Sequence, residues 1–276
     1  MTSQRPVGPR AFTSSLNARA TSMSKVTGRP TRELLELYYH RRLLARVFHA
    51  DADSWVLKGG QALLVRWPQA RYSTDIDLVH TVDESVVDDA VAALISAAST
   101  DLDDHLRYEH HDTSAERTAN RPSRKVRFKA MFGLRQLSVV SVDVVTAGTH
   151  PVGELHVEQL EAPFNVECGP WPDVRMWPLE DHVADKIAAM HERHGDRLRP
   201  STRFKDLIDL VLIAMNSALD GPTAHTALHR EVRRRRAAGT HLELPGDVHR
   251  SRSRLDFRLR SRSTQRPGTT RRIPHP

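Results

Sequence analysis

The clearest hydrophobic pattern begins at Thr31, in the segment TRELLELYYHRRLLARVF. Its apolar residues recur three and four positions apart, which is the spacing of an α-helix that buries one side. Threonine is also a residue type that caps helix N-termini. We therefore predict a core helix that Thr31 caps. The preceding residues 1–30 are rich in Ser, Thr, Arg and Pro, and are expected to form a flexible N-terminal segment.

A second pattern combines an apolar run, a glycine pair and two aspartates in WVLKGGQALLVRWPQARYSTDIDLV. The pair Gly59-Gly60 predicts a tight turn between a strand-like piece and a helix. Residues 71–79 then alternate in polarity and are predicted to form a strand. A helix is expected to begin at Asp83.

Two alternating segments, SRKVRFKAMFG and QLSVVSVDVVTA, are separated by a short break that contains glycine. Such a pattern predicts a β-hairpin. The segment PLEDHVADKIAAMHERHG predicts a helix with Pro178 near its start and Gly195 at its end. The segment TRFKDLIDLVLIAMNSAL predicts another helix. The residues of that helix expected to face a core are Leu207, Leu210, Val211 and Ala214.

The order of these elements predicts an α+β fold, in which a small mixed sheet with helices precedes a helical C-terminal half. A sheet-based domain is expected over residues 31–169 and a helical domain over 170–240. Residues 241–276 have no usable periodicity and are expected to form a basic, low-complexity tail.

The composition gives an indication of the cellular compartment. No apolar run approaches the ~18 residues of a membrane-spanning helix, and the N-terminus lacks the apolar core of a signal peptide. The single cysteine, Cys168, cannot form an internal disulfide. These features favour a cytoplasmic protein without a membrane partner.

The net charge of +7 is unevenly distributed. Residues from Arg230 onward include 14 arginines and four acidic residues, which leaves the remainder of the chain slightly acidic. Because the basic character belongs to the tail, the charge of the body gives no strong indication of a nucleic-acid partner.

The two aspartates have a geometric consequence. Side chains two apart in a strand point to the same side, so Ser73, Asp75 and Asp77 share one face, while Ile76 and Leu78 face the core. Two carboxylates this close raise each other's pKa unless a cation lies between them. A divalent metal with oxygen ligands is the simplest such cation.

A third carboxylate lies in the second strand of the predicted hairpin, where valines flank Asp143. An unpaired carboxylate within an apolar strand costs several kcal/mol. If this strand pairs beside residues 71–79, Asp143 completes a three-carboxylate site that can hold two Mg²⁺ ions.

The glycine pair suits an anionic ligand. Gly59 and Gly60 allow close approach of the backbone, and the N-terminus of the following helix favours negative charge. A triphosphate is an anion that also binds Mg²⁺. Lys58 and Arg71 are placed to neutralise its phosphates.

Taken together, these motifs resemble a known family. The arrangement LKGGQALL…RYSTDIDLV, with HVADKIAAM and RFKDLIDLV, is similar to the AbiEii/AbiGii toxins. These are type IV toxin–antitoxin nucleotidyltransferases that include the MenT-type toxins and have the minimal nucleotidyltransferase fold related to DNA polymerase β. The resemblance runs from about Ser15 to Leu219.

The resemblance implies a role for each matching residue. Gly59 and Gly60 would hold the NTP phosphates, and Ser73 occupies the family's serine position beside the metal-binding pair. Lys186 matches a lysine that contacts the triphosphate, and Asp206 matches an aspartate that supports it. From the residues alone, Lys186 and Asp206 are expected to form a pair, whereas His182, His191 and His194 are read as surface histidines.

The implied activity is Mg²⁺-dependent transfer of a nucleotidyl group from an NTP to an acceptor hydroxyl, with the tRNA 3′ end as acceptor and a winged-helix antitoxin as partner. Two alternatives stay open: an enzyme of the same class with a small-molecule or protein acceptor, and an inactive remnant that binds NTP or RNA. The Arg/Ser-rich tail departs from the family pattern. A frameshifted C-terminus and a basic tail with weak RNA affinity are both open explanations.

Overall fold

The computed structural model describes residues 9–82, 86–118, 121–146, 150–166, 169–195 and 197–245. Residues up to Leu242 form one compact unit, and Glu243–Pro276 form a second, of which only residues 243–245 are described. Almost all of the predicted tail therefore lies outside the described residues. The division near residue 170 stays a prediction.

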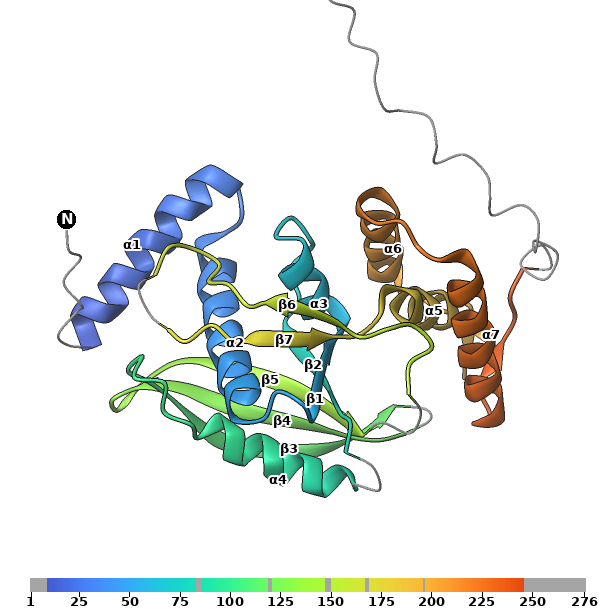
Figure 1. Cartoon of the computed structure of the whole chain (residues 1–276), viewed down its shortest axis with the longest axis horizontal. Helices are drawn as coiled ribbons and strands as arrows, with labels where there is room; N and C mark the ends of the chain where they lie inside the picture. Colours follow the sequence, from blue (N-terminus) through green and yellow to red (C-terminus); the bar gives the residue numbers. More distant parts are fainter. Residues whose placement is uncertain are drawn as a thin grey trace, which may run out of the picture. The chain divides into compact units, whose positions relative to one another are not determined.

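One mixed sheet dominates the described part of the first unit (Figure 1). Its strands are β1 (Trp55–Lys58), β2 (Asp75–His80), β3 (Leu106–Thr118), β4 (Arg121–Phe132), β5 (Arg135–Thr146), β6 (His156–Gln159) and β7 (Asp173–Met176). The order is β3-β4-β5-β2-β1-β7-β6. The predicted hairpin is confirmed as the antiparallel pair β4–β5. Strand β2 pairs parallel with β5 and antiparallel with β1, so it lies near the centre of the sheet.

Four helices precede or interrupt the strands: α1 (Pro9–Thr27), α2 (Thr31–Ala50), α3 (Gly59–Arg66) and α4 (Val87–Ala98). Helices α2 and α4 contact strands of the sheet and each other, and α1 packs on α2. The main core lies between these helices and the inward face of the sheet. The alternation in β4 and β5 explains this division, because Val126, Phe128, Val140, Val142 and Val144 are all buried there.

The core helix expected from Thr31 is confirmed, although Pro30 rather than Thr31 is its N-cap. The helix expected from Asp83 begins at Val87, and residues 83–85 lie outside the described part. The strand expected over residues 71–79 is shorter at its start and begins at Asp75.

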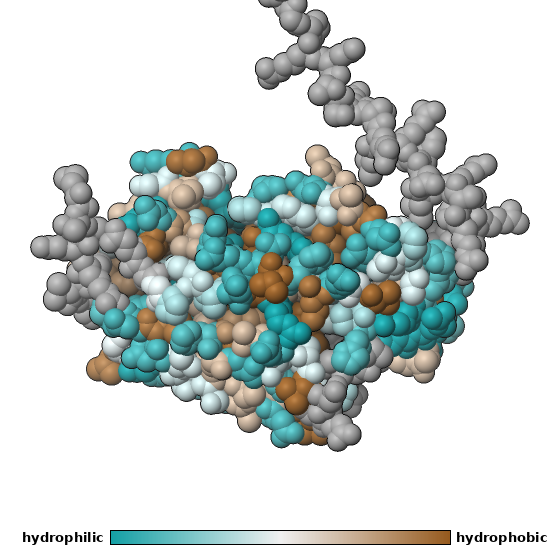
Figure 2. Space-filling model, viewed as in Figure 1, coloured by the Kyte–Doolittle hydropathy of each residue, from teal (hydrophilic) through white to brown (hydrophobic). Residues whose placement is uncertain are grey.

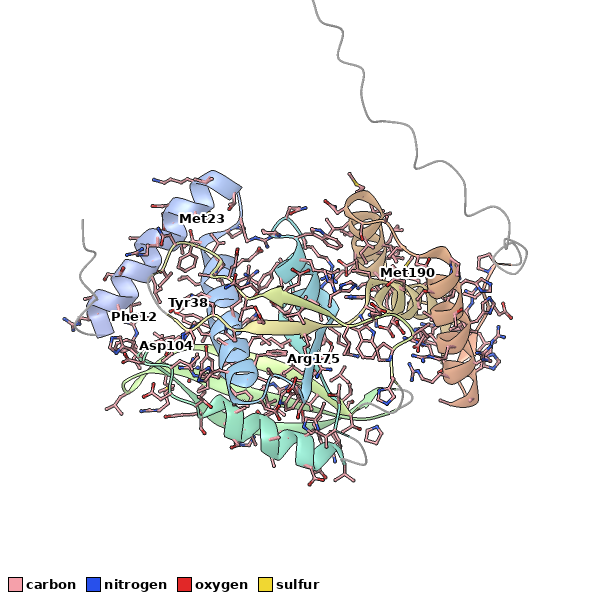
Figure 3. The ribbon with its side chains drawn as sticks, viewed as in Figure 1. Phe12, Met23, Tyr38, Asp104, Arg175 and Met190 are labelled. Atoms are coloured by element: carbon pink, nitrogen blue, oxygen red, sulfur yellow. The ribbon has the colours of Figure 1, made fainter. Side chains whose placement is uncertain are left out.

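Much of the segment expected to be flexible is helical. Helix α1 buries Phe12, Leu16 and Ala20 against the core, and Phe12, labelled in Figure 3, stacks on Phe132 with ring centroids 4.7 Å apart. Polar residues dominate this helix, but its apolar positions recur every four residues. That narrow stripe is enough to anchor it.

The C-terminal part holds α5 (Leu179–Met190), α6 (Phe204–Asn216) and α7 (Gly221–Ala237). A small sheet with the order β10-β8-β9 joins them, built from β8 (Glu192–His194), β9 (Arg199–Pro200) and β10 (His241–Leu242). Helix α5 ends at Met190, before the predicted Gly195, because β8 follows almost at once.

The predicted core face of α6 is wrong. Leu207 and Val211 are half exposed, whereas Asp206, Asp209 and Ile213 are buried. The helix is rotated so that its two aspartates face inward, toward the cations described below. Its apolar residues Phe204, Leu207, Ile208, Val211 and Met215 are left on the surface, and hydrophobic surface is visible over α6 in Figure 2.

Candidate active site

The three predicted carboxylates lie together on the sheet. Strands β2 and β5 pair in parallel, with Asp77 directly opposite Asp143 and Asp75 opposite Ser141. Asp75, Asp77 and Asp143 are partly exposed, while the alternating residues Ile76 and Leu78 of β2 are buried. The two-residue period of a strand therefore places all three carboxylates on the face away from the main core.

Gly59 lies against one of these carboxylates. It begins α3 with a φ of +70°, a conformation that side chains disfavour. A Cβ built on Gly59 would lie 1.8 Å from Oδ2 of Asp77. Both the backbone conformation and the space therefore require glycine at this position.

Gly60 is constrained by a different neighbour. A Cβ on Gly60 would lie 2.5 Å from Oγ of Ser73. Ser73 precedes β2 and therefore lies in the connecting loop, not in the strand expected from the sequence. The glycine pair thus brings the start of α3 close to both the aspartate strand and the serine loop.

A buried network fixes this serine loop. The amide Nε2 of Gln61 donates to the carbonyl oxygen of Ser73 at 2.7 Å and contacts Nδ1 of His40 at 2.8 Å. Burial lowers the pKa of His40 to about 4, so its ring is neutral at pH 7. A neutral Nδ1 can accept the hydrogen bond from Gln61.

A cation from β4 lies between two of the carboxylates. Lys125 is opposite Asp143 in the β4–β5 ladder. Its Nζ is 3.3 Å from Oδ1 of Asp143 and 3.8 Å from Oδ1 of Asp75. The sequence analysis gave Lys125 no role, because its contact with Asp75 depends on the order of the strands.

The donor set suits a hard divalent cation, because three carboxylates share one face of adjoining strands. In the part of the chain that the structure describes, however, no three His, Cys, Asp or Glu side chains are spaced to hold a metal ion. Lys125 is the cation that the described side chains place between Asp75 and Asp143. The carboxylate ligands are thus chemically suited to Mg²⁺, while the spacing of Asp75 and Asp143 in this structure accommodates an ammonium group.

A second group of charges joins α5 to α6. Nζ of Lys186 lies 3.1 Å from Oδ1 of Asp206 and 2.6 Å from Oδ2 of Asp209, and all three residues are buried. The predicted contact between Lys186 and Asp206 is therefore present. Asp209 was missed, although it lies three residues after Asp206 and hence on the same side of the helix.

The same group extends to two arginines. Nη2 of Arg71 lies 2.7 Å from Oδ2 of Asp209, the oxygen that Lys186 also contacts. Arg203 donates from Nε to the other partner, Asp206. Burial alone would raise the pKa of Asp206, but the hydrogen bond from Arg203 and the charge of Lys186 lower it below its ordinary value. Arg71 and Lys186 are thus held together at one oxygen.

Electrostatic coupling connects the two groups. Burial raises the pKa of Asp77 and the neighbouring Asp75 adds to this effect, while the charges of Lys58 and Lys186 oppose it. Lys58 is opposite Asp77 in the β1–β2 ladder. Asp185 also acts on Asp77 and is a further carboxylate that the sequence analysis missed.

Asp185 and His182 complete the surroundings on α5. Burial opposes ionisation of Asp185, but Arg235 on α7, with Nη2 at 2.5 Å from its Oδ1, is the main cause of a lowered pKa. Reading His182 as a surface residue is wrong, because it is only 4% exposed. Burial and the charge of Lys186 lower its pKa to about 3.

The arrangement described so far gathers carboxylates, cations and a glycine turn beside one face of a mixed sheet. The profile described as nucleotidyl transferase AbiEii toxin, type IV toxin–antitoxin system, matches residues 42–270. The chain belongs to this family. No match was found among curated proteins.

A solved structure shares the fold. MenT4, a nucleotidyltransferase toxin from Mycobacterium tuberculosis H37Rv, matches with 17% identity and a TM-score of 0.51 over 79% of this chain and 69% of that one. JHP933 from Helicobacter pylori matches with 18% identity and a TM-score of 0.43, over 65% of this chain and 66% of that one, slightly under two thirds of its length.

In the described residues, no helix is both long and apolar enough to cross a membrane.

Proposed function

We propose that this protein is a Mg²⁺-dependent nucleotidyltransferase toxin that transfers a nucleotidyl group from an NTP to an acceptor hydroxyl, the tRNA 3′ end. The acceptor oxygen forms a bond to the α-phosphorus, the bond to the β-phosphate oxygen breaks, and pyrophosphate leaves. The hydroxyl proton is released. The tRNA acceptor, a winged-helix antitoxin and a cytoplasmic location rest on the family resemblance.

Asp75, Asp77 and Asp143 would hold Mg²⁺, which supplies charge neutralisation at the reacting phosphate when it is bound. Gly59 and Gly60 open the start of α3 to the phosphates, where free N–H groups and the helix dipole favour an anion. Lys58 lies beside Asp77 and would neutralise a phosphate oxygen.

Lys186, which lies on α5, would also contact the triphosphate. Asp206 and Asp209 pair with its ammonium and orient it in a buried position. Arg71 shares Asp209 with Lys186, so both cations would act on the same anion. Positioning and charge neutralisation of this kind provide most of the catalysis in phosphoryl transfer.

The observation that carries this proposal is the register of β2 and β5. It places Asp77 opposite Asp143, with Gly59 packed against Asp77. A solvated strand edge would explain one aspartate pair, but it would not explain why a glycine with positive φ lies against the same carboxylate. An anion-binding turn beside a carboxylate cluster accounts for both features.

The proposal is tested by incubating the purified protein with Mg²⁺, total tRNA and each α-³²P NTP in turn. We expect label from at least one NTP to enter tRNA. Asp75→Ala and Asp77→Asn should abolish labelling, whereas Asp88→Asn, a change at an exposed surface pair with Arg124, should preserve it.

Each outcome has a definite meaning. Label in tRNA that depends on Asp75 supports the proposal and identifies the nucleotide. Label that enters the protein itself or a small alcohol would replace the tRNA acceptor while keeping the reaction class. Absence of label on every acceptor, with the protein folded, would overturn the enzymatic function.

A further inference from the structure

Lys125 is the starting point because its ammonium lies where two carboxylates meet. The side chain is 16% exposed, and its Nζ contacts Oδ1 of Asp143 at 3.3 Å and Oδ1 of Asp75 at 3.8 Å. These two aspartates come from different strands, β2 and β5, and Lys125 comes from a third, β4. The order of the strands therefore places a cation on the face of the sheet that carries the carboxylates.

The distances are those of an ion pair and not of metal coordination. Mg²⁺ binds oxygen ligands at about 2.0–2.1 Å and demands near-octahedral geometry. An ammonium that contacts both oxygens at more than 3 Å holds them apart. Within the described residues, no carboxylate group is spaced as a metal site, and Lys125 lies between Asp75 and Asp143.

We propose that the ammonium of Lys125 competes with the divalent metal for Asp75 and Asp143 and is displaced when the metal binds. The inference rests on the proposed function, because it assumes that these carboxylates hold Mg²⁺. Lys125 stabilises the empty site by offsetting part of the charge of three clustered carboxylates. It also weakens metal binding, because a lysine ammonium and a divalent cation repel each other at this range.

The sequence offers a matched control on the same strand. Lys129 lies four residues after Lys125, so both side chains point to the same face of β4. Lys129 is opposite Val139 on β5 and Glu109 on β3, however, and opposite neither Asp75 nor Asp143. Lys129→Met removes the same charge and length from the same strand without altering the contacts with Asp75 and Asp143.

The first test measures binding of Mn²⁺, as a spectroscopic substitute for Mg²⁺, by electron paramagnetic resonance in the absence of NTP. Lys125→Met should bind Mn²⁺ at least about tenfold more tightly than the unmodified protein. Lys129→Met should bind within about twofold of the unmodified protein, and Asp77→Asn should bind far more weakly. Equal or weaker binding by Lys125→Met would overturn the inference.

The Asp77→Asn variant distinguishes failure of the proposed competition from failure of the metal site itself. If Mn²⁺ binding depends on Asp77 but not on Lys125, the metal site stands and the competition is refuted. If no protein binds Mn²⁺ in an Asp77-dependent manner, the metal centre of the proposed function fails as well. The transfer of label to tRNA then tests the activity independently.

A second test uses the unmodified protein and does not depend on folding of a variant. Acetic anhydride acylates lysine amines that are free, and peptide mass spectrometry reports the extent at each position. Adding Mn²⁺ should increase acylation of Lys125 at least about threefold relative to Lys129, because the ammonium leaves its ion pairs. Unchanged or reduced acylation would show that Lys125 stays in place, which contradicts displacement.

Discussion

At the residue scale, Gly59 is the most constrained position of the site. Its φ of +70° would strain any side chain, and a Cβ would overlap the carboxylate of Asp77. Glycine at position 59 is therefore required for Asp77 to keep its position. The turn and the carboxylate cluster are a single unit.

This unit gives a direct prediction. Gly59→Ala should reduce nucleotidyl transfer at least about 100-fold, because Asp77 must move from its position among the carboxylates. Initial rates of label transfer to tRNA measure this loss. Gly133→Ala is the matched control, since Gly133 also has a positive φ but has open space where the Cβ would lie.

The control separates strain from displacement. Gly133→Ala should lower the free energy of unfolding by about 1–2 kcal/mol through backbone strain alone and leave the transfer rate unchanged. If both variants lost stability equally and kept full activity, the contact between Gly59 and Asp77 would have no catalytic importance.

Residue spacing revealed part of this site but not all of it. Asp75, Asp77 and the lone Asp143 stood out because carboxylates in apolar strands require an explanation. Lys125 did not, since lysine in an alternating strand is ordinary on a solvated face. Asp209 was not predicted, because the apolar residues of α6 suggested a core face that the helix does not bury.

At the element scale, buried charges fasten α2 to the start of β3. Asp104 accepts from Arg42 at 2.5 Å and from Arg46 at 2.6 Å, and all three side chains are essentially inaccessible to solvent. Figure 3 labels Asp104 near α2 and the edge of the sheet. One carboxylate thus compensates two buried guanidinium groups.

Removing this carboxylate should be costly. Asp104→Asn is expected to lower the free energy of unfolding by about 3–5 kcal/mol, because it leaves Arg42 and Arg46 buried without a counter-charge. Urea denaturation followed by circular dichroism measures the change. Asp112→Asn, on the β3 strand that follows Asp104, is the control: its pair with Arg127 is partly exposed, so less than about 1 kcal/mol should be lost.

The result would be contradicted if both variants lost the same stability. Equal losses would mean that the buried position of Asp104 has no special weight and that α2 is held by apolar packing alone.

Elements with strong periodicity could be predicted from the sequence, and those with weak periodicity could not. Helices α2 and α5 and the β4–β5 hairpin have regular apolar spacing that survives in the fold. Strand β3 was missed because LRYEHHDTSAERT is polar on both sides over most of its length, as suits an edge strand. Its pairing with β4 stabilises it as a strand, although its side-chain pattern does not indicate one.

At the scale of the whole molecule, buried histidines link stability to pH. Burial lowers the pKa of His40 to about 4, below the value of 6.5 expected in an unfolded chain. Between these values the unfolded chain binds a proton that the folded chain does not. The stabilising contribution is therefore complete above pH 6.5 and declines as the pH falls toward 4. His182, with a pKa of about 3, acts in the same direction.

We expect His40→Gln to flatten this dependence. Between pH 6.5 and 4.5, the unmodified protein should lose up to ~3 kcal/mol more unfolding free energy than the variant does. Urea midpoints at several pH values measure the difference, and the value at pH 7.5 corrects for changes in packing. Parallel profiles for the two proteins would exclude His40 as a source of acid sensitivity.

The order of strands in the sheet has a consequence for synthesis of the protein. The carboxylates of β2 reach their full set only when β5 inserts beside them, and Lys186 and Asp209 follow still later in the chain. A ribosome that is still translating the first half of the message therefore carries a chain without an assembled centre. For a member of a toxin family, we expect this ordering to leave unfinished copies without the proposed activity.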